Sequence, residues 1–182
     1  MVEDGPDNGF GGLFSGYEFR TNRNGGSATV EGIELSYSQQ LNFLPGILGA
    51  LGVVANMTEL RTEGTYTSDE SAITDDLEGF VPRSANLGLS FQEFGFEGRI
   101  LWNYRSPYLR ARATDPNRIS YRESRAAFDI TTKYRVRRGL EIYADIANVF
   151  DVAERQYDVF PERPGYVQYN GRQISVGISG KF

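Results

Sequence analysis

The chain has 182 residues, and its 21 Gly, 11 Tyr and 12 Phe suit strands and tight turns better than packed helices. It contains no Cys and no His, which excludes disulfides, thiolate metal sites and the commonest general base. A net charge of -5 argues against a nucleic-acid partner, which would favour a basic stripe. We therefore expect an all-β fold with no catalytic residue, no cofactor and no metal site.

The hydrophobic pattern excludes a membrane-spanning helix but not a membrane-spanning strand. The longest apolar run, from Phe43 to Ala55, is short and is broken by proline and glycine. A spanning helix needs about 20 apolar residues, whereas a spanning strand needs only about 9–11 with alternating character.

Alternating strands are predicted along the chain, beginning with a possible strand over Gly12 to Thr21. Thr29 to Leu41 and Gly49 to Arg61 are expected to pair across the turn at Asn42 to Gly46. Ala85 to Phe91 and Phe96 to Tyr104 flank the tight connection Glu93-Phe94-Gly95 and form the next predicted hairpin.

The second half of the chain continues the pattern. Ala126 to Tyr134 and Leu140 to Ile146 are predicted to form a hairpin over Arg135 to Gly139, and Arg172 to Phe182 alternates to the last residue. This gives about eight strands, joined alternately by short turns and by three long polar segments, 62–80, 106–120 and 151–165. Short turns on one side and long loops on the other are typical of an antiparallel transmembrane β-barrel.

Six segments together resemble the barrel of TonB-dependent outer-membrane receptors. They are VEGIELSYSQQL (30–41), LPGILGALGVVANMT (44–58), VPRSANLGLSF (81–91), GRILWNYRSPYL (98–109), GLEIYADIANVFD (139–151) and NGRQISVGISGKF (170–182). The last two resemble the family's penultimate and final strands. The resemblance implies that residues 1–182 are a single segment, the C-terminal part of a larger barrel, with the plug domain absent.

The family resemblance also implies a location and partners. These are the outer membrane of a Gram-negative bacterium, membrane lipid and lipopolysaccharide, a small nutrient ligand, the TonB complex acting through the plug, and the barrel-assembly machinery. The nutrient would be a ferric siderophore, cobalamin or a carbohydrate. Because Met1 to Gly5 lacks the pattern of a secretory signal, we expect a longer precursor.

Three groups of residues are candidates for these roles. Arg and Tyr side chains on an outer loop could bind an anionic chelate or a sugar, although a solvated loop is the simpler interpretation; they are Arg105, Tyr108, Arg110, Arg112, Arg118 and Tyr121. A polar wall facing the lumen is expected from Glu97, Arg99, Asn103, Asp129, Lys133, Glu141 and Asp145. By resemblance, Ile174, Val176, Ile178 and Phe182 would be the C-terminal assembly signal.

Two alternatives remain open from sequence alone. A closed barrel of about eight strands, with a structural or adhesive role, would also explain the pattern. A soluble ligand-binding barrel would require the apolar faces to converge on a cavity instead.

Overall fold

The computed structural model describes residues 2–18, 26–66, 76–113 and 115–181, and strands are the main regular structure in these residues. Its two helices are short 3-10 turns, and neither of these described helices could cross a bilayer. The elements are β1 (Gly26–Gln40), η1 (Gly46–Ala50), β2 (Leu51–Tyr66), β3 (Arg83–Glu93), β4 (Phe96–Arg105), β5 (Tyr108–Ala111), η2 (Pro116–Arg118), β6 (Ser120–Arg122), β7 (Arg125–Arg137), β8 (Leu140–Ala147), β9 (Glu154–Asp158), β10 (Pro164–Gln168) and β11 (Gln173–Gly180).

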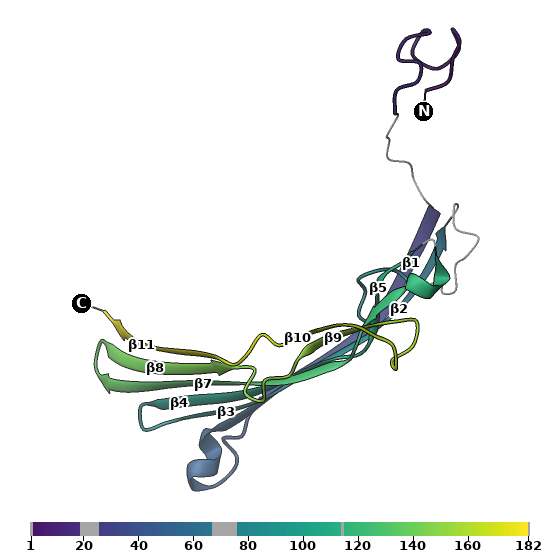
Figure 1. Ribbon diagram of the computed structural model, residues 1–182. Helices are drawn as coiled ribbons and strands as arrows, with labels where there is room; N and C mark the ends of the chain where they lie inside the picture. Colours follow the sequence, from purple (N-terminus) through teal and green to yellow (C-terminus); the bar gives the residue numbers. More distant parts are fainter. Residues whose placement is uncertain (1, 19–25, 67–75, 114, 182) are drawn as a thin grey trace.

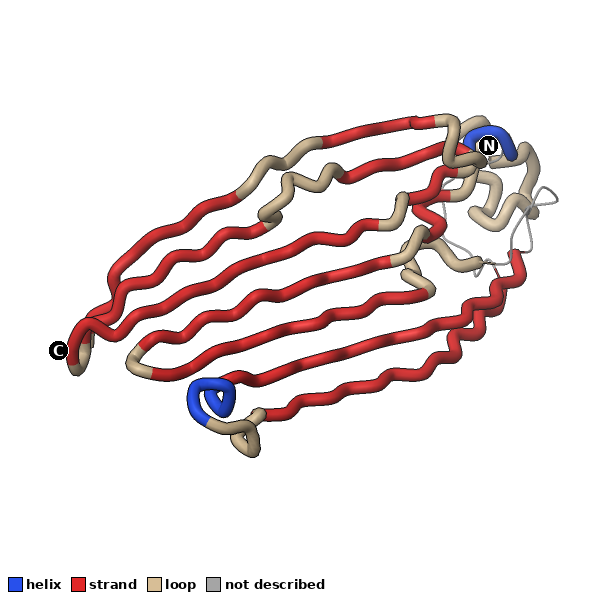
Figure 2. The backbone as a smooth tube through the Cα atoms, turned by 90° about the horizontal axis from the view of Figure 1, so that it is seen from below, coloured by secondary structure: helices blue, strands red, loops and turns tan. Residues whose placement is uncertain are grey.

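Seven strands form one antiparallel sheet in the order β1-β2-β3-β4-β7-β8-β11 (Figures 1 and 2). The three predicted hairpins are confirmed: β1 pairs with β2, β3 with β4, and β7 with β8. Phe94 and Gly95 join β3 to β4 with φ angles of 52° and 76°. Two consecutive positive φ values suit a two-residue hairpin, because they match the twist of the flanking strands.

Four short strands form a second sheet in the order β10-β9-β6-β5, beyond one end of the first. Each is separated by only a few residues from a long strand, as β5 follows β4 after Ser106 and Pro107. The segments 106–120 and 151–165 are therefore not simply the polar connections that the sequence predicts, because they contain β5 and β9. We call the end with the second sheet the loop end and the opposite end, with the tight turns, the turn end (Figure 2).

The proposed strand at Gly12 to Thr21 is wrong over its described part. Residues 12–18 form turns and coil, and residues 19–21 lie outside the described residues. Asn8 organises this coil, since its side-chain oxygen accepts hydrogen bonds from the backbone N–H groups of Phe10 and Gly12. Within residues 12–18, Gly12, Phe14 and Gly16 have φ values of 81°, 60° and 79°, a left-handed backbone state that does not fit a regular strand.

The seven-stranded sheet has two chemically opposite faces, because the strands pair in register and side chains alternate along each one. The apolar face includes Ile33, Leu35, Tyr37, Met57, Leu87, Leu89, Ile100, Trp102, Phe128, Ile130, Ile142, Ile146, Ile174, Val176 and Ile178. The polar face includes Ser36, Asn56, Ser90, Arg99, Asn103, Asp129, Lys133, Asp145 and Ser175.

The apolar face has no protein layer against it in the described structure. Ile174, Val176 and Ile178 are 67%, 76% and 72% exposed, and among described large side chains only Leu109 is fully buried. A soluble sheet would bury this face against helices or a second sheet. The fold therefore lacks a conventional core. A soluble ligand-binding barrel would need this apolar face to enclose a cavity, and in the described residues it is exposed instead.

Aromatic rings bound the apolar face at both ends. At the loop end Trp102 stacks on Tyr104 with ring centroids 5.7 Å apart, and Phe128 meets Phe150 edge to face at 5.5 Å. At the turn end the Phe91 and Phe96 rings are 6.1 Å apart. At about 3.4 Å per residue, the path from Phe96 to Tyr104 is about 27 Å long. With a barrel tilt of about 35–45°, the two rings are about 20 Å apart along the barrel axis, close to the height of a lipid-facing band.

Candidate functional site: an arginine cluster on the polar face

The seven residues predicted to form a polar wall lie on the polar face. Cross-strand pairing places Glu97 opposite Lys133 and Asp145 opposite Thr131. The Asn103 amide donates to an Asp129 carboxylate oxygen at 2.8 Å. The remaining members are half-buried or exposed, and Glu141 approaches Arg135 at 3.6 Å. The wall thus contains both acidic and basic side chains rather than charges of one sign.

At the loop end of this face, three arginines converge on one carboxylate, that of Glu154 at the start of β9. Arg105 Nη2 donates to Glu154 Oε2, and Arg122 Nη1 reaches the same oxygen at 3.0 Å. Arg125 Nε lies 3.2 Å from the other oxygen, Oε1. These four residues, which we call the arginine cluster, come from β4, β6, β7 and β9, so only the assembled sheets create it.

The cluster holds charges that would otherwise repel each other. Arg105 and Arg125 are direct cross-strand partners, an arrangement that destabilises a sheet when the charges are alike. Glu154 lies against both and neutralises one charge of the three, leaving an excess of two positive charges. The four side chains are 20–27% exposed, so these charges are partly shielded from water but not fully buried.

The predicted ligand residues fall into two groups. Arg105 belongs to the cluster, and its guanidinium lies 5.4 Å from the ring centroid of Tyr108, a cation–π contact. The other four lie outside the cluster. Arg110 donates to Ser120 Oγ at 3.4 Å, and Arg112 donates to the carbonyl oxygen of Asp76 at 3.1 Å. Arg118 is the last residue of η2, and the Tyr121 ring stacks on that of Tyr157 with centroids 5.4 Å apart.

Tyr121 and Tyr157 form a neutral stack in the second sheet. Burial raises the pKa of both hydroxyls. The nearby charge of Asp76 raises the pKa of Tyr121 further, and the neighbouring Tyr121 raises the pKa of Tyr157 further. Because their ordinary pKa already lies near 10, both remain protonated at physiological pH. They serve as stacked packing groups rather than as proton acceptors.

Asn148 positions Glu154. It follows β8 at a φ of 54°, is 7% exposed, and its backbone N–H donates to Asp129 Oδ1 at 2.8 Å. Its side chain accepts from Val152 N at 2.9 Å and donates to the carbonyl oxygens of Val152 and Gly171 at 3.3 Å. These bonds fix the break between β8 and β9, so Glu154 emerges beside Arg105 and Arg125.

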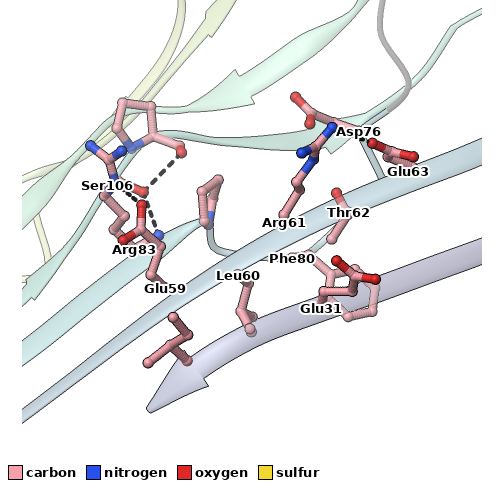
Figure 3. Close-up of a pocket in the computed structure, with 14 residues that line it drawn as sticks. Glu31, Glu59, Leu60, Arg61, Thr62, Glu63, Asp76, Phe80, Arg83 and Ser106 are labelled. Atoms are coloured by element: carbon pink, nitrogen blue, oxygen red, sulfur yellow. Dashed lines mark hydrogen bonds and ion pairs between the residues drawn. The ribbon is translucent and has the colours of Figure 1, made fainter. Parts of the chain in front are cut away.

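A second charged surface lies beyond the apolar face at the loop end. It is an open hollow of about 1030 Å³ between β1, β2 and the segment before β3 (Figure 3). Its two arginines are paired, Arg61 with Glu63 at 2.6 Å and Arg83 with Glu59 at 3.1 Å. Glu31 and Asp76 add further negative charge, so this hollow is acidic, whereas the arginine cluster is basic.

The sequence matches the model of a protein family described as "TonB dependent receptor-like, beta-barrel" over residues 2–149. The chain belongs to this family. Its members are receptors and transporters of the Gram-negative outer membrane rather than enzymes. No curated protein matches the chain.

Solved structures agree on the fold. The chain is similar to the copper transporter OprC, with a TM-score of 0.61 and 20% identity over 85% of this chain and 24% of that one. It is similar to the ferric yersiniabactin uptake receptor FyuA from Yersinia pestis, with a TM-score of 0.57 and 21% identity over 85% of this chain and 23% of that one. The chain thus spans about a quarter of the length of these relatives.

Asn148→Ala should destabilise the receptor. The substitution removes three side-chain hydrogen bonds from a buried turn and leaves alanine at a positive φ, at a combined cost of about 2–5 kcal/mol. Unfolding of the receptor by denaturant in lipid vesicles would measure the loss. Asn148→Gly is the matched control, because glycine tolerates the φ; it should recover the backbone part of the loss only. A wild-type midpoint for Asn148→Ala would show that the turn does not depend on this side chain.

Proposed function

We propose that this chain is a barrel segment of an outer-membrane receptor that imports a scarce nutrient by TonB-dependent, energy-coupled transport. The family match over residues 2–149 is the observation that supports this most directly. The nutrient is a ferric siderophore, cobalamin or a carbohydrate. The two similar structures are named for different cargoes, copper and ferric yersiniabactin, and similarity of fold does not choose among the classes.

In this receptor the apolar face meets lipid and the polar face lines the lumen. Exposed aliphatic side chains between two groups of rings suit a lipid-facing band. The charged residues of the acidic hollow lie beyond the Trp102 and Tyr104 rings, where the headgroup region and lipopolysaccharide would begin. Substrate and plug would then contact the polar face, including the arginine cluster.

The coupling elements belong to other parts of the receptor. By family resemblance, a plug domain fills the lumen and carries the segment that the TonB complex pulls, and we place both outside residues 1–182. The strand β11 would carry the assembly signal, with Ile174, Val176 and Ile178 presented on the apolar face. Phe182, the fourth member of the proposed signal, lies outside the described residues.

The alternative of a self-contained small barrel conflicts with the strand order. Closure would require β1 to pair with β11, and these strands lie at opposite edges of the seven-stranded sheet, each with one described partner. An open edge exposes unpaired N–H and C=O groups, which lipid cannot satisfy. The remaining strands of a larger barrel would satisfy both edges.

Two neighbouring positions on β11 test which face meets lipid. In the complete receptor, Val176→Arg places a charge on the apolar face and should cost about 2–4 kcal/mol of unfolding free energy in vesicles. Ser175→Arg, the control, places the same charge on the polar face opposite Asp145 and should cost much less. Denaturant unfolding measures both, and equal losses would refute the assignment of the faces.

The small-barrel alternative has its own test. Residues 1–182 alone, refolded into detergent, should aggregate or remain extended, because both sheet edges lack partners. Gel mobility with and without boiling, together with circular dichroism, would detect a compact β-rich form. A compact species whose mobility changes on boiling would favour the self-contained barrel over the receptor segment.

The proposed transport is tested in cells expressing the complete receptor, with labelled ferric siderophores, cobalamin and maltooligosaccharides as probes. One probe class should accumulate only when the TonB complex is functional, because the plug must be moved by work done across the periplasm. Accumulation that is equal with and without a functional TonB complex would overturn the proposal.

A further inference from the structure

The arginine cluster has more positive charge and more donors than its own carboxylate can satisfy. Each guanidinium has five N–H donors, whereas one carboxylate offers about four acceptor positions. The Nε–H of Arg122 is enclosed by protein and has no acceptor among the described residues. That enclosed donor shows that Glu154 does not satisfy the cluster, while the partly exposed guanidiniums and the surplus charge are complementary to a ligand rich in anionic oxygens.

We propose that Arg105, Arg122 and Arg125 bind a small multivalent anion bearing carboxylate or phosphate oxygens, free or as a metal chelate, with Glu154 as the resident counter-ion. This rests on the proposed function and narrows its cargo to an anionic class. The site lies where the polar wall ends and the second sheet begins, so a solute entering from the loop end meets it before the mixed charges of the wall.

Glu154 has two opposing effects on such a ligand. It holds the three guanidiniums close together, which orients their donors before the ligand arrives. It also competes with the ligand for the same donors and cancels one positive charge. Neutralising this carboxylate while keeping its shape should therefore strengthen anion binding, provided that the fold survives.

A purely structural ion network predicts something different. In that case the arginines are present only to hold β4, β6, β7 and β9 together through Glu154, and replacing any of the four destabilises the receptor without specific effect on anions. The sign of the Glu154→Gln effect on binding separates the two interpretations.

The experiment measures citrate and pyrophosphate binding to the complete receptor in detergent by titration calorimetry, at low and moderate ionic strength. Arg122→Gln should weaken binding about 10-fold or more, as expected for loss of a charge-assisted hydrogen bond. Glu154→Gln should tighten it several-fold. Arg155→Gln is the matched control, because Arg155 is the next residue of β9, its side chain is 55% exposed and it lies 4.0 Å from Glu123 rather than pairing with Glu154. It should bind as wild type does.

Heat-modifiable mobility checks that each variant is folded. If Glu154→Gln does not fold, two other measurements test whether the arginine cluster binds the anion. These are the comparison of Arg122→Gln with Arg155→Gln and the fall in wild-type affinity with salt. The proposal is overturned if neither anion binds the wild-type receptor, if Arg122→Gln and Arg155→Gln behave alike, or if a folded Glu154→Gln binds more weakly than wild type.

The transport assay distinguishes failure of this inference from failure of the proposed function. TonB-dependent uptake of a neutral carbohydrate without citrate or pyrophosphate binding would retain the function and eliminate the anion site. Anion binding together with uptake that is equal with and without a functional TonB complex would support the site and refute the proposed function.

Discussion

The alternation of side chains along paired strands is the constraint on which this structure depends. Each strand of the seven-stranded sheet must present apolar groups to one environment and polar groups to the other, and pairing in register extends this division across the whole sheet. A shift of one residue between β4 and β7 would place Ile100 or Ile130 among charges. The register is therefore set by this division between two faces rather than by a protein core, which the described structure scarcely has.

The local pattern of the sequence was enough to predict the long strands and their hairpins. Alternation within β3, β4, β7 and β8 and the tight connections between them are properties of neighbouring residues. The possible strand at Gly12 to Thr21 failed because apolar residues recur there without strand-compatible backbone: the glycines and Phe14 take positive φ. Spacing of aromatic residues alone does not distinguish a strand from a glycine-rich coil.

The candidate site could be predicted only in part, for a physical reason. Arg105 and Tyr108 stood out as members of a basic, aromatic segment, but Glu154 follows 49 residues after Arg105 and lay within a segment interpreted as a loop. Its contact with Arg105 requires β4, β7 and β8 to be neighbours, and it also requires the chain to break after β8. That break depends on Asn148, whose hydrogen bonds reach Val152 within the same turn and also Asp129 and Gly171, which are distant in sequence.

The sheet also separates charge by face at its loop end. On the side of the apolar face, Arg61 and Arg83 are each paired with a glutamate, and the hollow around them is left acidic. On the polar face, three arginines share one carboxylate and positive charge remains. Both surfaces are formed by strands that extend past the aromatic rings. A few residues of β2, β4 and β7 therefore give the two faces of one sheet net charges of opposite sign. Since partly enclosed charges are less screened by salt than exposed ones, the field of the arginine cluster would persist at salt concentrations where that of the acidic hollow fades. An anionic solute near the loop end would therefore be drawn to the polar face rather than to the rim outside it.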